Sequence, residues 1–426
     1  EDYHSIVLGL SEELVKKEPL AMPEFIKSSP GVLDKLTIVQ LGRWYEEGVH
    51  ILEQNKDGGL AFFKVESAHS ENVIESLSSG IEFDRVKPVM EMYCRGLAGA
   101  EIKLAQTGDL VEKNIGWVSN ESPSTEGTTV FVPSHVDRYL TKSENFSWFK
   151  VISTHQVAHL EFGSFNFEFD KPSTLFSDIR PKLYQINIQK IPEDQLPEQE
   201  VEIPNDFFVT DMRRFFNLMD DRELGLDIFT IVEDGRLDTY VKNDYPGITK
   251  SYITVQHDSL KDRPPVETLP SREAILEFLI QLSLQQKNVV VVPTEYVSQA
   301  RKIASVANRV FSVGTNVEDS AEATLRIYAV LKSIPNQTVN SDGWQNIDLS
   351  EIGGEIEEQN SEENDEEYIN QFTDSANQDD DLKDEQEYKP VTEVEYRGDY
   401  KPELVQLLDR LRNNTTDTEG SITDQP

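Results

Sequence analysis

The stretch VISTHQVAHLEFGSF, Val151 to Phe165, carries the pattern on which the interpretation of this chain rests. His155 and His159 are four residues apart, so on a helix they face the same way and can bind one metal ion. In the H-E-x-x-H pattern of zinc peptidases, the glutamate between the histidines takes a proton from the metal-bound water. This chain has Gln156 there, and a neutral amide cannot accept that proton.

The residues around the two histidines repeat as they do in a buried helix. From Asn145 to Phe165 the following side chains recur at a spacing of three or four: Trp148, Val151, Ile152, His155, Ala158, His159 and Phe162. The stretch TTVFVP, residues 128–133, is typical of a strand. An edge strand in this place is what zinc peptidases of this kind use to hold an extended substrate. We therefore expect a mainly α fold with a small β component.

Two histidines do not complete a zinc site, because zinc of this type takes a third protein ligand and keeps its fourth position for water. The acidic candidates are Glu161, Glu168, Asp178 and Glu233. Glu161 points off the histidine face by the helical period. Glu168 and Asp178 lie in loop-like sequence, which does not determine where they point.

Glu233 is the predicted third ligand. It lies on one stripe with Leu226, Phe229, Leu237 and Tyr240. A carboxylate on a buried face costs several kcal/mol unless it is paired or bound to a metal. The alternative is a salt bridge to Arg213, Arg214 or Arg236. Asp234 and Asp238 are candidates for accepting the outward ring N–H of a metal-bound histidine.

Replacing the glutamate by Gln156 separates metal binding from catalysis. Losing a general base typically costs about 10²- to 10⁴-fold in rate, whereas a metal still lowers the pKa of its bound water. We expect a metal site without peptidase activity. In the alternative Glu161 or another carboxylate serves as the base. We also expect that Gln156→Glu creates peptidase activity if the cleft is open.

Composition restricts the partners. The chain has 426 residues and a formal net charge of −38, which repels phosphate backbones and anionic lipid surfaces and favours basic protein partners. Its one cysteine, Cys94, cannot form an intrachain disulfide. The sequence shows no apolar run of membrane-spanning length and no signal-peptide pattern at its start. We expect a cytoplasmic protein.

Four regions follow from the pattern along the chain. Residues 1–107 read as a helical N-terminal region, and residues 108–335 as the domain with the histidines. Residues 351–390 hold 16 acidic residues and two lysines, and such a segment buries too little apolar surface to fold. We therefore predict a disordered acidic linker over 336–395. Residues 396–426 read as a short helix, which needs a surface to dock on, and a tail.

The motifs together resemble a known family. HQVAHLEFGSF followed by LDIFTIVEDGRLDTYVKNDYPGI resembles the NorD/CbbO group, the nitric-oxide-reductase and rubisco activation proteins. The likeness extends upstream through TTVFVPSHVDRY and downstream through SREAILEFLIQLSL, over most of residues 30–335. This family commonly has H-E-x-G-H, and the chain departs from it at Gln156 and Ala158.

The resemblance implies a zincin-like, metallopeptidase-related domain followed by an acidic linker and a von Willebrand factor A domain. It also implies a MoxR-type AAA+ ATPase partner and a target enzyme. EVEYRGDYKPELVQLLDRLRNN looks like the lead-in to that A domain, whose D-x-S-x-S signature is absent from this sequence. His155, His159 and Glu233 map onto the ligand positions.

Three functions follow from these observations. The first is a non-proteolytic, zinc-binding adaptor that couples a target enzyme to the ATPase. The second is an active zinc peptidase with a non-standard base. The third is a metal-free structural interaction domain in which the two histidines belong to the core.

Overall fold

The computed structural model describes residues 2–109, 122–189, 209–284, 289–348, 361–374, 386–408 and 410–411. The chain divides into two compact units. The first comprises residues 1–86 and 135–149, and the second comprises residues 87–134 and 150–426. Helices α6 (Phe83–Ala98) and α8 (Lys142–Glu161) contribute residues to both units. The fold is mainly helical with small sheets, as predicted.

The first unit is a helical cluster around aromatic side chains. Its helices are α1 (Asp2–Lys17), α2 (Ala21–Leu33), α3 (Ile38–Gln54), α4 (Lys56–Phe63) and α5 (Ala68–Leu77). Trp44 stacks on Phe62 with ring centroids 5.4 Å apart and donates its ring N–H to Ser70 Oγ at 3.1 Å. A two-stranded ribbon of β1 (Ile81–Glu82) and β5 (His135–Val136) completes this unit.

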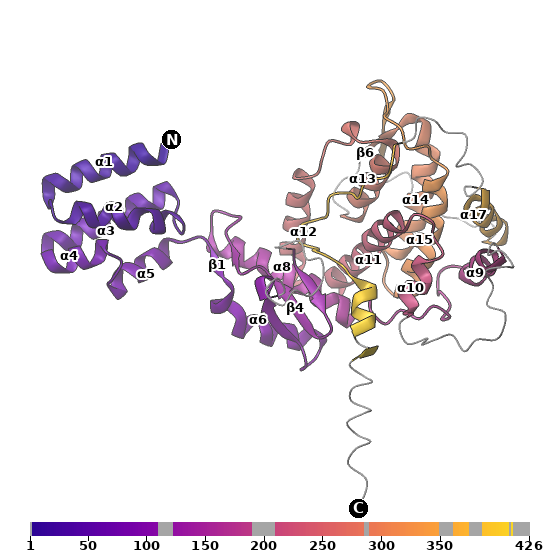
Figure 1. The fold of residues 1–426 in the computed structure, drawn as a ribbon, viewed down its shortest axis with the longest axis horizontal. Coiled ribbons are helices and arrows are strands. Elements are labelled where there is room, and N and C mark those ends of the chain that lie inside the picture. Colours follow the sequence, from indigo (N-terminus) through magenta and orange to yellow (C-terminus); the bar gives the residue numbers. More distant parts are fainter. Residues whose placement is uncertain are drawn as a thin grey trace, which may run out of the picture. The chain divides into compact units, whose positions relative to one another are not determined.

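Helix α11 (Arg222–Asp244) forms the centre of the second unit. It packs against α12 (Pro246–Lys261), α13 (Ser271–Ser283), α14 (Val297–Val310) and α15 (Val317–Lys332), as Figure 1 shows. Two shorter helices are α9 (Arg180–Gln189) and α10 (Asp211–Phe216), and the 3₁₀ turns are η3 (Val266–Thr268) and η4 (Thr294–Tyr296). Every residue of α11 from Ile231 to Asp238 is buried. The helix therefore has no solvent side along this part of its length.

Two small sheets belong to the second unit. Strand β4 (Thr129–Val132) pairs in parallel with β2 (Lys103–Gln106) and antiparallel with β3 (Ser124–Glu126), and β6 (Val289–Pro293) pairs with β7 (Trp344–Asp348). The strand predicted in TTVFVP is β4, but it is the middle strand of its sheet. The prediction of an edge strand is therefore wrong for TTVFVP, because β4 pairs on both sides and the edges of this sheet are β2 and β3. Residues 110–121, near the start of the predicted domain with the histidines, lie outside the described residues.

The predicted disordered linker, residues 336–395, contains ordered structure. Strand β7 and helix α17 (Ser361–Asp374) both lie in this range. Helix α17 packs on α15, where Arg326 Nη2 and Asp365 Oδ1 are 2.7 Å apart and the rings of Tyr328 and Phe372 are 5.1 Å apart. The prediction from composition fails here because aromatic and acidic side chains of α17 contact α15, where Arg326 is buried. Residues 349–360 and 375–385 of the predicted linker lie outside the described residues.

A buried charge cluster lies beneath α17. Glu322 on α15 accepts hydrogen bonds from Arg180 Nε at 2.9 Å and Arg326 Nη1 at 2.6 Å, and Asp178 and Asp365 bind the same two arginines. Three carboxylates therefore face two guanidinium groups. Burial, together with a proton shared with Asp178, raises the pKa of Glu322 to about 7.

The short helix predicted after residue 396 covers residues 402–408 and docks on the second unit. The side chain of Gln406 accepts a hydrogen bond from the Met212 backbone N–H at 3.0 Å and donates to the carbonyl oxygens of Phe165 and Phe167 at 3.1 and 3.0 Å. Val405 is fully buried. The tail, residues 412–426, lies outside the described residues.

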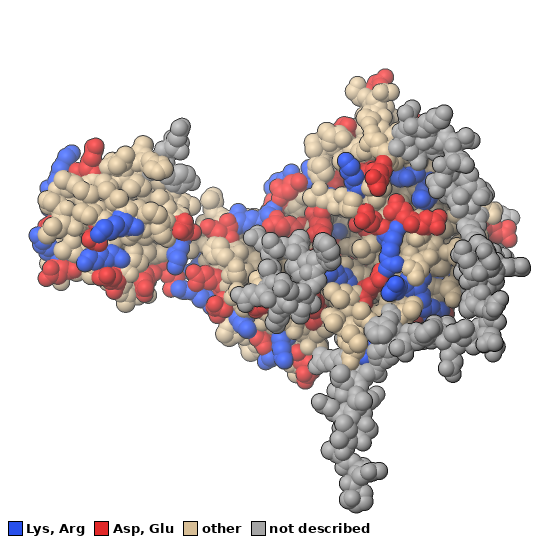
Figure 2. Space-filling view, in the orientation of Figure 1, with Lys and Arg blue, Asp and Glu red and all other residues tan. Residues whose placement is uncertain are grey.

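The surface shows no single field of one charge in the view of Figure 2, where acidic and basic side chains are mixed over the helices. Across the described parts of the chain, no helix combines the length and apolarity needed to cross a membrane.

Candidate metal centre

Two helices bring the histidines and two aspartates together. His155 and His159 lie one turn apart on α8, and Asp234 and Asp238 lie one turn apart on α11. Because residues four apart share a helix face, each helix presents a pair of these side chains to the other. All four are at most 4% exposed. The predicted burial of the two histidines is therefore observed.

The ligand atoms of three of these residues converge. His155, His159 and Asp234 each offer one atom within 4.8 Å of the others, and together they could hold a metal ion. Oδ1 of Asp234 lies 3.4 Å from Nε2 of His155 and 3.7 Å from Nε2 of His159. Tetrahedral zinc with bonds of about 2.0–2.1 Å has ligand atoms roughly 3.4 Å apart. The observed separations match that edge length to within a few tenths of an ångström.

Asp238 orients the ring of His155. Its Oδ1 lies 2.9 Å from Nδ1 of His155, and the hydroxyl of Tyr252 lies 3.1 Å from the same nitrogen. A carboxylate on one ring nitrogen directs the other nitrogen toward a metal and makes the ring a stronger ligand. Asp238 thus has the contact that the sequence suggested for it, whereas Asp234 lies among the ligand atoms themselves.

The two histidines differ in protonation. Burial opposes the charged form of His155, but its hydrogen bonds to Asp234 and Asp238 outweigh burial and raise its pKa to about 9. Burial and then the positive charges of His155 and Arg236 hold the pKa of His159 well below its usual range. A proton on Nε2 of His155 therefore points at Asp234, in the place that a cation on this group would take.

His159 keeps an unshared electron pair. It is neutral, and among the described residues its buried Nδ1 has no hydrogen-bond partner. Its ring stacks on Tyr400 with centroids 4.6 Å apart and an interplanar angle of 13°. Two imidazoles and one carboxylate are the kind of ligand set that zinc accepts, so the residues present fit a zinc ion.

Glu233, the predicted third ligand, lies in a different network. Its carboxylate accepts hydrogen bonds from Arg236 at 2.5 and 2.8 Å, from Ser164 at 2.5 Å and from Ser320 on α15 at 2.7 Å. Arg236 holds the pKa of Glu233 below its usual range against the opposing effect of burial. Glu233 therefore forms the salt bridge to Arg236 that the sequence analysis gave as one alternative to metal binding. Among the described residues, the carboxylate that converges with the two histidines is that of Asp234 and not that of Glu233.

The other acidic candidates also have separate partners. Glu161 accepts a hydrogen bond from the Tyr245 hydroxyl, and Asp178 binds Arg180. Glu168 is exposed, and its backbone N–H donates to Glu318. Among the described residues none of these carboxylates belongs to the group that could hold a metal.

Gln156 acts as a clamp on the backbone. Its Nε2 donates to the carbonyl oxygen of Arg397 at 2.5 Å, and its Oε1 accepts from the Thr125 hydroxyl at 2.8 Å. The side chain is 1% exposed. Both ends of the amide are therefore used, and the donor end is one that a glutamate could not supply.

Residues 396–400, with the sequence YRGDY, cover the group; we call them the covering segment. Arg397 Nη2 binds Asp238 Oδ2 at 2.7 Å, and the hydroxyl of Tyr396 donates to the same oxygen at 2.5 Å. The segment also runs along β3, since the backbone N–H of Asp399 donates to the carbonyl oxygen of Pro123 at 2.8 Å. The sequence interpretation missed these residues. Two tyrosines and an arginine next to an acidic stretch were the only signal.

Comparisons of the chain with models of known protein families, with curated proteins and with solved structures found no match. The resemblance to the NorD/CbbO group therefore stays a prediction based on the quoted motifs.

Proposed function

We propose that this chain is a non-proteolytic accessory protein that binds zinc at His155, His159 and Asp234. The observation that carries the proposal is the use of Gln156, whose amide is engaged by Thr125 and the Arg397 carbonyl. The position that holds the proton acceptor in zinc peptidases is here part of the structural framework. A bound zinc ion would link α8 to α11 and neutralise Asp234.

Burial of the group supports a binding role over a catalytic one. His159 is 1% exposed beneath Tyr400, and His155 is fully buried with Tyr396 in edge contact at 5.6 Å. A peptide substrate would have to reach a metal held by these histidines, and Tyr396 and Tyr400 of the covering segment pack on their rings. An active peptidase is the second candidate, and the Thr125–Gln156–Arg397 contacts argue against it.

The partner part of the proposal rests on the motif resemblance. We propose that the chain acts as an adaptor between a MoxR-type AAA+ ATPase and a target enzyme, with a zincin-like domain that binds and does not cut. The net charge of −38 supports a basic protein partner. Co-elution of the purified chain with such an ATPase, measured by light scattering, tests this part; separate elution at micromolar concentrations counts against it.

Metal content and unfolding of the full chain test the zinc part. We expect one zinc per chain by elemental analysis, and stabilisation of about 2.7 kcal/mol when free zinc is a hundredfold above its dissociation constant. His159→Gln should lose both effects, since its neutral ring makes the fewest polar contacts of the three. His257→Gln is the matched control, because His257 is exposed on α12.

The three functions have separable outcomes. Zinc binding without cleavage of a peptide library supports the proposal. Chelator-sensitive cleavage that His159→Gln abolishes would establish the peptidase instead. A chain that takes up no zinc, and whose stability zinc leaves unchanged, would support the metal-free structural domain.

A further inference from the structure

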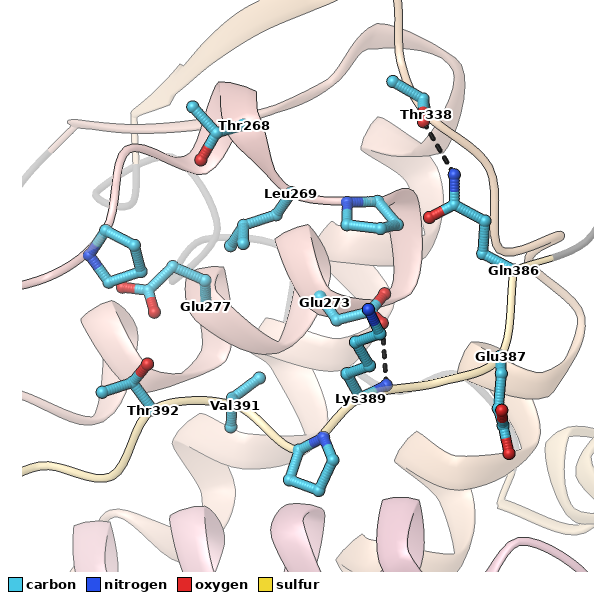
Figure 3. A pocket seen from close by; sticks show the side chains of 13 residues that line it. Thr268, Leu269, Glu273, Glu277, Thr338, Gln386, Glu387, Lys389, Val391 and Thr392 are labelled. Atoms are coloured by element: carbon cyan, nitrogen blue, oxygen red, sulfur yellow. Dashed lines mark hydrogen bonds between the residues drawn. The ribbon is translucent and has the colours of Figure 1, made fainter.

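A pocket of about 270 Å³ opens in the second unit between η3, the start of α13 and residues 386–392 (Figure 3). Pockets for whole small molecules measure roughly 300–1,000 Å³, so this one suits a single side chain or a small organic ion. Leu269, Pro270, Pro390 and Val391 supply apolar wall. Its rim includes Lys389, which is exposed. The pocket shares no residue with the candidate metal centre.

Glu273 lines this pocket and has one carboxylate oxygen without a hydrogen-bond partner among the described residues. The residue is 4% exposed. Its Oε1 accepts hydrogen bonds from the Lys389 backbone N–H at 3.0 Å and from Asn336 Nδ2 at 3.2 Å. Its buried Oε2 has no hydrogen-bond partner among the described residues. A buried carboxylate oxygen without a donor costs free energy that a cationic ligand would recover.

The neighbouring glutamate in the same pocket has its negative charge neutralised by an arginine. Glu277 lies one turn further along α13, and Arg263 binds both of its carboxylate oxygens at 2.5 to 3.1 Å. Within the described part of the chain, no ion pair of this kind reaches Glu273. Lys389 also lines the pocket, and its contact with the Glu273 carboxylate is the hydrogen bond from its backbone N–H. Arg263 therefore neutralises the carboxylate of Glu277, whereas the carboxylate of Glu273 has no ion-pair partner among the described residues.

We propose that this pocket binds the cationic end of a lysine or arginine side chain presented by a peptide segment of another protein. The ammonium or guanidinium group would donate to Oε2 of Glu273, and the alkyl stem would lie against the proline and leucine wall. Charged hydrogen bonds of this kind are roughly twice as strong as neutral ones. Phosphate ligands do not fit, because three glutamates, Glu273, Glu277 and Glu387, line the pocket. A chain of net charge −38 also attracts basic segments at long range.

The test is titration of the full chain by ligand-observed NMR at low salt. The probes are acetylated, amidated tripeptides Gly-Lys-Gly and Gly-Arg-Gly, the neutral isostere with norleucine, and spermidine. We expect millimolar binding of one or both basic peptides and at least tenfold weaker binding of the norleucine peptide. Equal binding of the norleucine peptide would overturn the proposal. The proposal would also be overturned if neither basic peptide bound at concentrations up to about 10 times the expected millimolar dissociation constant. Binding of spermidine alone would assign the pocket to free polyamines and likewise overturn it.

Three variants locate the binding. Glu273→Gln keeps the acceptor oxygen for Lys389 and Asn336 and should weaken the basic peptides about tenfold or more. Glu267→Gln, the same change at an exposed position on η3 outside the pocket lining, should change the affinity by less than about twofold. Lys389→Ala removes a rim cation, so it should tighten binding about two- to threefold, and it carries the test if Glu273→Gln does not fold. Unchanged affinity in both Glu273→Gln and Lys389→Ala refutes the assignment.

Discussion

Replacing Gln156 by glutamate restores the H-E-x-x-H sequence of zinc peptidases, and we expect it to destabilise the fold. The amide Nε2 donates to the Arg397 carbonyl oxygen at 2.5 Å inside a side-chain environment that is 1% exposed. A glutamate presents an acceptor where the donor was. The Arg397 carbonyl then loses its partner, which costs about 1–3 kcal/mol, and the two contacts of this side chain, the Thr125 hydroxyl and the Arg397 carbonyl, offer the new carboxylate no counter-charge.

The magnitude follows from these two effects together. An uncompensated buried charge typically destabilises by about 3–5 kcal/mol, so we expect Gln156→Glu to lower the free energy of unfolding by about 4 kcal/mol or more at neutral pH. Gln156→Met has similar length and no charge and should cost only the lost hydrogen bonds, about 1–3 kcal/mol. The difference between the two variants isolates the charge.

Urea unfolding followed by tryptophan fluorescence measures both variants, with the midpoint and slope compared with those of the parent chain. A Gln156→Glu chain within 1 kcal/mol of the parent would refute the clamp and imply that residue 156 faces an open, hydrated cleft. We also expect no peptidase activity from this variant, with or without zinc. The sequence-based expectation that Gln156→Glu creates a peptidase required an open cleft, and the covering segment fills that place.

Three further predictions concern the same unit. Gly398→Ala should destabilise by about 2 kcal/mol or more in urea unfolding, because φ is +69° and an added Cβ would lie 2.1 Å from the Pro123 carbonyl oxygen; a loss below 0.5 kcal/mol would contradict this packing. The folded pKa of Glu322, about 7, lies above the ordinary 4.5, so its contribution to stability is present below pH 4.5 and lost as the pH rises through about 7. Glu322→Gln mimics the protonated form and should flatten that decline, by roughly 3 kcal/mol at pH 8; an unchanged pH profile of unfolding would argue against a protonated Glu322. Finally, Glu233→Gln should destabilise the chain yet leave one zinc bound, whereas Asp234→Asn should abolish zinc uptake; the reverse pattern would restore Glu233 as the ligand.

The local patterns identified the helix that carries the histidines, although every residue of it from 151 to 159 is buried. The i, i+4 spacing of His155 and His159 determined that they share a face, and the apolar spacing around them indicated that this face is buried. The strand at TTVFVP was also visible, since a run of β-branched residues between turn residues favours a strand. Which strand lies at the edge was not visible, because that depends on β2, some 25 residues upstream.

Composition predicted disorder over residues 336–395, and this failed in the described residues for a definite reason. Mean polarity reports how much apolar surface a segment can bury, and it does not report what the segment meets. Asp365 meets Arg326, a cation that α15 keeps buried. The acidic character of α17 is thus part of what holds it in place.

The third ligand shows where sequence reasoning stopped. The period of α11 correctly marked Glu233 as buried, but every residue from 231 to 238 is buried because other elements surround the helix. Adjacent residues on a helix point about 100° apart, so Glu233 faces Ser320 and Arg236 while Asp234 faces the histidines. A hydrophobic pattern along the sequence distinguishes buried from exposed positions. It does not show which neighbouring element a buried side chain contacts. The sequence by itself determined the histidine pair and the missing base; only the packing of α8 and the covering segment against α11 decided which carboxylate completes the group and what Gln156 holds.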